Sequence, residues 1–235
     1  MKTARIELHY LPCLAYFSAI SAYGEIVVEK FEHYQKQSYR NRCYLKGPHR
    51  VETLIVPVTR KGRTTRITDV RIDHAQKWAN NHWRTIQTAY GNAPFFEYYA
   101  ADLSAVFEKK HAFLYDLNFE IMTLCLKWLR IEAAVKETTG YEEKVSEAEE
   151  DLRGVINPKK EDGCNKFYKS IEYQQVFGSK FVPNLSVIDL VFNQGPGSWA
   201  TTTATTAATT TTAAPTTTAA TTSAPTTTDP PVSVV

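Results

Sequence analysis

The chain has 235 residues and a formal net charge of +2, from 27 Lys and Arg against 25 Asp and Glu. This balance excludes a general nucleic-acid binder, so any basic binding site must be local. No run approaches 18 apolar residues and the N-terminus lacks the apolar core of a signal peptide. We therefore expect a cytoplasmic protein without membrane insertion.

Composition divides the chain near residue 199. Residues 200–228 contain only Ala, Thr, Ser and Pro, with nothing to bury and no charge to pair. Such a segment cannot offset the entropy of ordering itself. We expect a disordered low-complexity tail over residues 200–235 and a single folded domain over residues 1–199, which carries a formal charge of +3 because Asp229 is the only charge in the tail.

The first half of the chain predicts short strands around one helix. Pro12 can begin that helix and Gly24 can end it. A turn is expected at Gly47–Pro48, and a basic turn at Arg60–Arg63. The expected strands are Ile6–Tyr10, Glu25–Glu29, the two segments on either side of the Gly47–Pro48 turn, and Ile67–Asp73.

The second half predicts helices. Helical spacing runs through Trp78, His82, Ile86 and Ala89, and two further helices are expected over residues 94–110 and 111–131. The acidic segment 141–152 is expected to be a solvated surface. A short helix is expected to run through Phe192 to a stop at Gly195, with Asn184 or Ser186 as its cap.

Strands followed by helices predict a single α+β domain, with a mixed sheet from the N-terminal half and helices mainly in the C-terminal half. The first strand–helix–strand step leaves a partly parallel sheet open as an alternative.

A basic segment, KQSYRNRC, separates two of the expected strands. Lys36, Arg40 and Arg42, with Gln37 and Asn41, supply many hydrogen-bond donors and no acid. Arginine forks bind phosphate or carboxylate in a bidentate manner, so this segment is a candidate site for an anionic ligand such as a sugar nucleotide. The alternative is a solvated loop whose arginines pair with Glu29, Glu32 or other nearby acids of the chain.

His82 is the candidate general base. It lies on the predicted helix between Asn81 and Trp83, and a neutral imidazole suits deprotonation of an attacking amine or hydroxyl. The alternative is a hydrogen-bonded core histidine. A thiol–histidine pair of His9 and Cys13 is conceivable, but the break between strand and helix does not guarantee their contact. The four cysteines form no CxxC pair, so no metal site is expected, and no cofactor is implied.

Six ordered blocks resemble the WbqC-like protein family over Ile6 to Pro196. They are YLPCLAYFSAI, EKFEHYQKQSYRNRC, LIVPV, ITDVRI, WANNHWRTIQTAYGNAPFFEYY and FVPNLSVIDLVFNQGP. Many members begin with His-Gln-Pro-x-Tyr-x-Pro, whereas Ile6, Glu7, Leu8 and His9 precede Tyr10 here. A role of the family's leading histidine therefore cannot be moved onto His9.

The resemblance implies a role in surface polysaccharide (O-antigen-type) biosynthesis. The expected activity is a transferase that moves an aminoacyl or acyl group onto a sugar nucleotide, and a non-catalytic sugar-nucleotide-binding or scaffold protein is the alternative. In the transferase, His82 would take the proton. Lys36, Arg40 and Arg42 would hold the anionic part of the substrate, and Gln37, Asn41 and Tyr10 would complete the binding site.

Overall fold

The computed structural model describes residues 2–59, 62, 64–159, 161–197 and 199. The expected tail and most of the basic turn at Arg60–Arg63 lie outside the described residues. Within the described part, no helix combines the length and the apolarity needed to cross a membrane.

A four-stranded parallel sheet has the strand order β7-β2-β1-β8. Its middle strands are buried on both faces, because consecutive residues are buried in each: Arg5 and Ile6 in β1, and Val27 and Val28 in β2. The strands are β1 (Thr3–Ile6), β2 (Glu25–Val28), β7 (Ala134–Glu137) and β8 (Glu149–Asp151).

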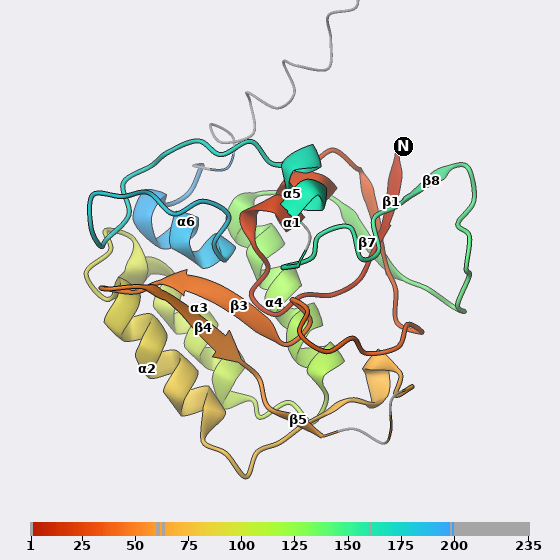
Figure 1. Cartoon of the computed structure of the whole chain (residues 1–235), viewed down its shortest axis with the longest axis horizontal. Helices are drawn as coiled ribbons and strands as arrows, with labels where there is room; N and C mark the ends of the chain where they lie inside the picture. Colours follow the sequence, from red (N-terminus) through yellow and green to blue (C-terminus); the bar gives the residue numbers. More distant parts are fainter. Residues whose placement is uncertain (1, 60–61, 63, 160, 198, 200–235) are drawn as a thin grey trace, which may run out of the picture.

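A long excursion between β2 and β7 builds the other half of the molecule, with β3 and β4 as an antiparallel hairpin lying across the helices (Figure 1). Its elements are β3 (Arg42–Lys46), β4 (Val51–Ile55), β5 (Val58–Thr59), the 3-10 helix η1 (Ile67–Asp69), β6 (Arg71–Ile72), α2 (Trp78–Tyr90), α3 (Phe96–Glu108) and α4 (Leu114–Leu129). The remaining helices are α1 (Leu14–Ile20), α5 (Glu161–Phe167) and α6 (Val187–Gln194).

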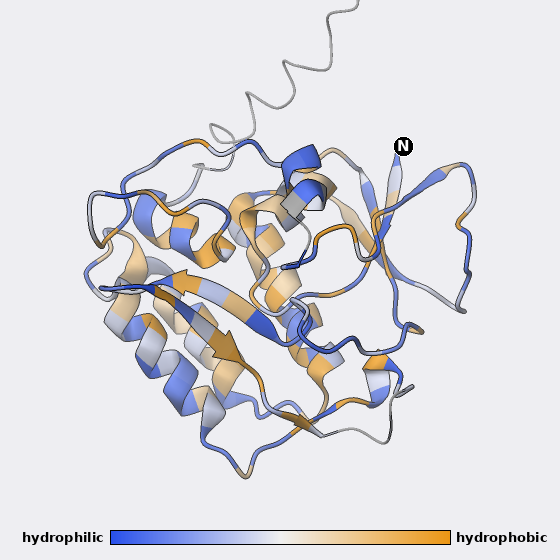
Figure 2. Cartoon of the chain, in the orientation of Figure 1, coloured by the Kyte–Doolittle hydropathy of each residue, from blue (hydrophilic) through white to orange (hydrophobic). Residues whose placement is uncertain are grey.

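The helices follow their apolar spacing. In α2, Trp78, His82, Ile86 and Ala89 are buried while the opposite face is polar, as Figure 2 shows. The α4 helix is apolar around most of its circumference and runs through the centre of the molecule. These two helices confirm the periodicity expected from the sequence.

The described residues form a mixed α/β fold. Its central sheet is parallel, in agreement with the alternative that the first strand–helix–strand step suggested. Two of the expected strands differ from the structure. The first strand is Thr3–Ile6 and ends where Ile6–Tyr10 was expected to begin, and Ile67–Asp73 is a 3-10 turn followed by the two-residue strand β6. The acidic segment 141–152 is largely exposed, as expected, but the sequence did not predict that Glu149–Asp151 within it pair with β1 as β8.

The segment before α6 ties distant parts of the chain together. The backbone N–H of Leu14 donates to Leu185 and that of Ser186 donates to Tyr44. The side chain of Asn184 accepts a hydrogen bond from the N–H of Ala15, so it caps α1 and not its own helix. Gly195 follows α6 at φ +70°, where an added Cβ would meet the ring of Phe95.

Candidate functional site

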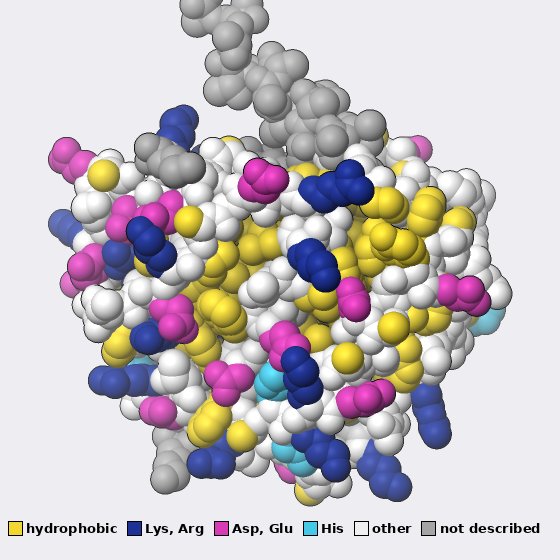
Figure 3. Space-filling view, turned by 180° about the vertical axis from the view of Figure 1, so that it is seen from behind, with side chains coloured by type: hydrophobic (Ala, Val, Ile, Leu, Met, Phe, Trp, Pro, Cys, Tyr) yellow, Lys and Arg dark blue, Asp and Glu magenta, His cyan; other side chains and the backbone are white. Residues whose placement is uncertain are grey.

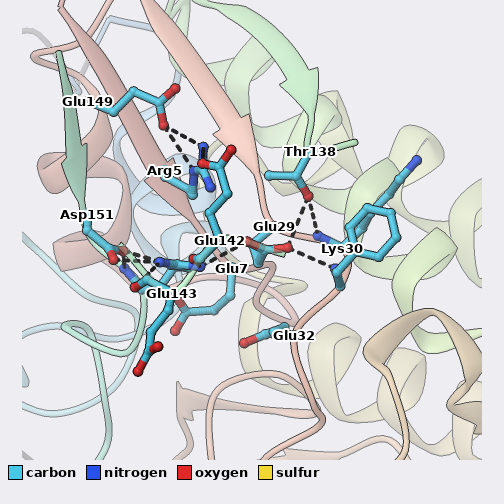
Figure 4. Close-up of polar contacts among 12 residues, drawn as sticks. Arg5, Glu7, Glu29, Lys30, Glu32, Thr138, Glu142, Glu143, Glu149 and Asp151 are labelled. Carbon is cyan, nitrogen blue, oxygen red and sulfur yellow. Dashed lines mark hydrogen bonds and ion pairs between the residues drawn. The ribbon is translucent and has the colours of Figure 1, made fainter. Parts of the chain in front are cut away.

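Polar and charged side chains gather where the four parallel strands end. Glu7 follows β1, Glu29 follows β2 and Thr138 follows β7 (Figure 4). Arg153 lies two residues after the end of β8. Ligands of open parallel sheets bind beyond this edge, at the point where the strand order reverses. Here that point lies between β1 and β8, where the N–H of Gly154 donates to the carboxylate of Glu7 at 2.9 Å.

Glu29 joins three strand ends. Its Oε1 accepts from the hydroxyl of Thr138 at 3.0 Å, and its Oε2 pairs with Nη1 of Arg153 at 3.0 Å. Arg153 also binds Asp151 through Nε and Nη2. The bonds of Glu29 fix the ends of β2, β7 and β8 relative to one another, whereas Asp151 holds Arg153 within the end of β8.

Arg40 of the basic segment KQSYRNRC also lies in this cluster. Its Nε lies 2.8 Å from Oε1 of Glu32, its Nη2 bonds the other oxygen of the same carboxylate, and Nη2 also lies 3.6 Å from Glu7. The guanidinium is almost completely buried. Its backbone carbonyl accepts from the side chain of Asn118 on α4 at 2.7 Å. Arg40 therefore has the acidic partners that the alternative reading of the segment required.

Glu7 and His9 form a buried pair with a 3.2 Å contact between Oε1 and Nε2. Burial alone would raise the pKa of Glu7, but the hydrogen bond from His9 and the charge of Arg40 outweigh it and lower that pKa to about 2. Burial lowers the pKa of His9, against the opposing effect of Glu7. At neutral pH the pair is therefore a carboxylate and a neutral imidazole, held between Tyr16 and Tyr39.

The basic segment divides into residues with different environments. Lys36 and Gln37 are exposed, and Gln37 lies in a turn with φ +54°. This part of the segment is therefore not an extended strand. Asn41 is buried and its Nδ2 donates to the carbonyl of Val56 at 2.9 Å. Arg40 and Asn41 thus make contacts within the fold.

Within the basic segment, Arg42 is the arginine that has no acidic partner among the described residues. It begins β3, is half-buried, and its Nε is buried with no hydrogen-bond partner there. Tyr44 lies two residues further along the same strand and is also half-buried, whereas Cys43 between them faces the core. Side chains alternate along a strand, so Arg42 and Tyr44 share one face of the hairpin.

A cavity of about 410 Å³ lies beside that face. Its walls come from the residues around Tyr39 and Tyr44, from the segment after β8, from α5 and from residues 182–185. The polar lining side chains are those of tyrosine, asparagine and serine, and among the described residues that line the cavity none is charged. The tyrosines of the lining are Tyr39, Tyr44 and Tyr168, and the asparagines are Asn157, Asn165 and Asn184.

The predicted base, His82, is a buried residue of α2. Its Nδ1 lies 2.8 Å from the hydroxyl of Tyr10, its ring packs edge-on against Trp78 at 5.2 Å, and it hydrogen-bonds the backbone of Ile55. Burial lowers its pKa to about 4. The structure brings His82 and Tyr10 together, but neither lines the 410 Å³ cavity, and the catalytic role of His82 stays a prediction.

Sequence reasoning named Glu32 as a possible partner of the arginines, and Arg40 pairs with it. It named Asn184 only as a possible helix cap and did not single out Glu7 or the other asparagines of the cavity. The signal for Glu7 was an acid at the end of an apolar strand, whereas Asn157 and Asn165 lie in a region whose apolar residues have no regular spacing. Among the described residues, no group of three or more potential ligands is arranged for a metal ion.

Comparison with known proteins agrees with the sequence blocks. The profile of the WbqC-like protein family matches residues 8–165 and 160–201. The chain belongs to the WbqC-like protein family. A similar protein is "Uncharacterized protein Rv1507c" of Mycobacterium tuberculosis, 26% identical over 219 residues, which cover 83% of this chain and 94% of that protein. No solved structure matches the chain.

The two arginines of the basic segment, Arg40 and Arg42, are expected to contribute differently to the stability of this WbqC-like chain. Arg40→Ala leaves two buried carboxylates without their cation and should lower the free energy of unfolding by about 3–5 kcal/mol. Arg42→Ala removes no ion pair and should change it by less than about 1 kcal/mol. Urea unfolding of both variants measures the difference, and equal losses would refute the division of roles.

The low pKa of Glu7 predicts acid sensitivity. A carboxyl whose folded-state pKa is depressed stabilises the fold above its unfolded value, 4.5, and loses that contribution as pH falls toward about 2. Between pH 4.5 and 3 the loss should be about 2 kcal/mol. Urea midpoints measured from pH 6 to pH 3 should fall less steeply for Glu7→Gln than for the wild type. Parallel slopes would show that Glu7 does not contribute.

Proposed function

We propose that this chain binds a sugar nucleotide in surface polysaccharide assembly and transfers an aminoacyl or acyl group onto it. The observation that carries the proposal is the position of Arg42. Its guanidinium has no acidic partner in the described chain, and it shares a strand face with Tyr44 of the 410 Å³ cavity. A neutral polar cavity next to an available cation suits a ligand with a sugar ring and a phosphate.

The cavity suits the sugar part of such a ligand. Tyrosine rings offer flat apolar surfaces for the C–H faces of a sugar, and asparagine amides both donate and accept hydrogen bonds with hydroxyl groups. Burial raises the pKa of Tyr39 and of Tyr168, so both hydroxyls stay protonated and can donate at neutral pH. The absence of charge from the lining favours the uncharged end of the ligand there.

Arg42 suits the phosphate. Two residues along a strand span about 6.6 Å, so the guanidinium can reach a phosphate attached to a sugar that contacts Tyr44. The planar fork of arginine binds two phosphate oxygens at once. Lys36, exposed in the preceding turn, is a further cation for the same anion, and Gln37 beside it can donate from its amide.

The proposed reaction is acyl transfer. The lone pair of an amine or hydroxyl on the sugar attacks the donor's carbonyl carbon. The bond to the leaving group then breaks, the leaving group keeps the electron pair, and the attacking atom gives up its proton. His82 is the proposed acceptor of that proton, since its imidazole is neutral at physiological pH.

A non-catalytic sugar-nucleotide-binding or scaffold protein is the second candidate. The observation in its favour is that the imidazole of His82 already bonds Tyr10 and Ile55 inside the fold. Burial also raises the pKa of Cys13 to about 12 and raises that of Cys43, so neither thiol is an activated nucleophile.

Arg42→Lys is expected to weaken binding of UDP-glucose at least tenfold, about 1.4 kcal/mol, because lysine cannot reproduce the bidentate fork. Isothermal calorimetry on the full chain measures the affinity. Arg50→Lys is the matched control, because Arg50 is exposed and pairs with Glu52. Wild-type affinity in a folded Arg42→Lys protein would refute the phosphate contact.

His82→Gln separates the two candidate functions. In a transferase it should abolish acyl transfer onto the sugar nucleotide while leaving ligand affinity within about tenfold. Thermal unfolding of the variant provides the check on folding. Loss of folding would identify His82 as a core histidine, and unchanged transfer would remove it from the mechanism.

A further inference from the structure

A smaller cavity, of about 250 Å³, lies at the opposite end of β3 from Arg42. Lys46, the last residue of β3, lines this cavity, and the rest of the lining comes from the segment 172–181. The cavity adjoins the 410 Å³ cavity, because Phe181 lines the smaller one and the next residue, Val182, lines the larger one. Its volume is below the range of drug-sized ligand sites, so its ligand has to be small.

Lys46 is a buried cation that forms no ion pair among the described residues. It is 7% exposed, and its Nζ donates to Oε1 of Gln175 at 3.0 Å and to the backbone carbonyl of Lys180 at 2.7 Å. Both acceptors are neutral amide oxygens, whereas an ammonium has three donors. A buried charge is costly unless an opposite charge and hydrogen bonds satisfy it. An anionic group in the cavity would supply both.

The acid of the same hydrogen-bond network, Asp189, is satisfied by other donors. Its carboxylate accepts from the hydroxyl of Tyr90 at 2.8 Å, from the hydroxyl of Tyr173 at 2.6 Å and from Nε2 of Gln175 at 2.8 Å. The charge of Lys46 opposes the rise that burial causes in the pKa of Asp189, so the two groups attract each other across Gln175. One N–H of the ammonium nevertheless stays available to a ligand.

Gln175 holds the wall of the cavity in place. Its Oε1 accepts from the backbone N–H of Val182 at 3.0 Å, and its Nε2 donates to the carbonyl of the same residue at 3.0 Å. The buried amide thus pairs with the backbone as a neighbouring strand would. Because Lys46 bonds the same Oε1, the ammonium is fixed in position before any ligand arrives.

The lining also offers partners for a positively charged group. Glu172 is an exposed acid of the cavity, and the rings of Tyr173 and Phe181 meet edge to face with their centres 5.1 Å apart. A carboxylate attracts an ammonium by charge, and aromatic rings attract it through their faces. The small cavity therefore combines a fixed cation with an acid. An α-amino acid carries the complementary carboxylate and ammonium on one carbon.

A zwitterion also suits a protein without a strong surface field. On the face that Figure 3 shows, Lys and Arg are interspersed with Asp and Glu, so no extended field of one sign would draw an ion to that surface. A ligand without net charge needs no such field. Its affinity depends on the local placement of Lys46 and Glu172.

We propose that the 250 Å³ cavity binds a small α-amino acid, with its carboxylate on Lys46 and its ammonium at Glu172. The inference is drawn from the lining of this cavity and does not rest on the proposed sugar-nucleotide site at Arg42.

The test is calorimetric titration of the full chain with L-alanine, and with propionate and ethylamine as partial ligands. L-alanine is expected to bind at least tenfold more tightly than either partial ligand, because it alone carries both charged groups. Equal affinity for L-alanine and propionate, or no binding of L-alanine at millimolar concentration, would overturn the proposal.

Glu172→Gln removes the partner of the ammonium at an exposed position, so the variant is expected to fold. Its affinity for L-alanine should fall at least tenfold, to that of propionate, and its affinity for propionate should not change. Glu147→Gln, at an exposed position outside the cavity, is the matched control and should keep L-alanine affinity within twofold. Wild-type affinity for L-alanine in Glu172→Gln would contradict the assigned orientation.

Lys46→Met removes the partner of the carboxylate and should lower the affinity for L-alanine and for propionate alike. Thermal unfolding checks the fold, because the variant also loses the bonds to Gln175 and Lys180. A measurement on the wild type needs no variant: the ring resonances of Tyr173 and Phe181 should shift in the NMR spectrum when L-alanine is added. Rings that do not respond while L-alanine binds would place the ligand elsewhere.

The Arg42→Lys variant separates this inference from the proposed function. It should bind L-alanine like the wild type even if its affinity for UDP-glucose falls. L-alanine binding that is lost in Arg42→Lys and retained in Glu172→Gln would place the amino acid in the 410 Å³ cavity and refute the smaller site.

Discussion

The buried pairing of Arg40 with Glu32 and Glu7 is the interaction on which the candidate site depends. Burying a charge costs several kcal/mol unless partners and hydrogen bonds satisfy it, so the three side chains tolerate little displacement. Glu7 follows β1 and also accepts a hydrogen bond from the N–H of Gly154, which follows β8. The pairing with Arg40 therefore fixes the basic segment against the carboxyl edge of the sheet. The position of β3, which begins two residues after Arg40, follows from that attachment.

This attachment gives the residues of one short segment different environments. Arg40 turns inward to the carboxylates and Asn41 donates to the backbone of Val56, so both side chains are bound inside the fold. Arg42 begins the hairpin on its half-buried face, without an acid, next to Tyr44 of the cavity. Arg40 therefore stabilises the fold, and its attachment positions Arg42, the arginine that is proposed to bind an anion.

The sequence predicted the elements whose signal is local. The spacing of Trp78, His82 and Ile86 identified α2, and the apolar length of α4 identified a core helix. It failed at β8, whose residues Glu149–Asp151 are all acidic. An edge strand of a parallel sheet needs backbone pairing more than apolar side chains, and here Glu149 is paired with Arg5 of β1. The acidic stretch by itself does not indicate that Arg5, 144 residues away in the sequence, pairs with Glu149.

The sequence identified which residue types make up the candidate site, but it could not identify their interaction partners. Three cations without an acid in one segment correctly indicated that acids must come from elsewhere, yet counting charges cannot say whether a ligand or the chain supplies them. For Arg40 the chain does, through Glu32 only eight residues earlier. The cavity depends on residues from Tyr39 to Leu185, which meet because Ser186 bonds Tyr44 and Asn184 caps α1. Contacts of this range are set by the packing of the whole fold, so sequence spacing alone does not contain them.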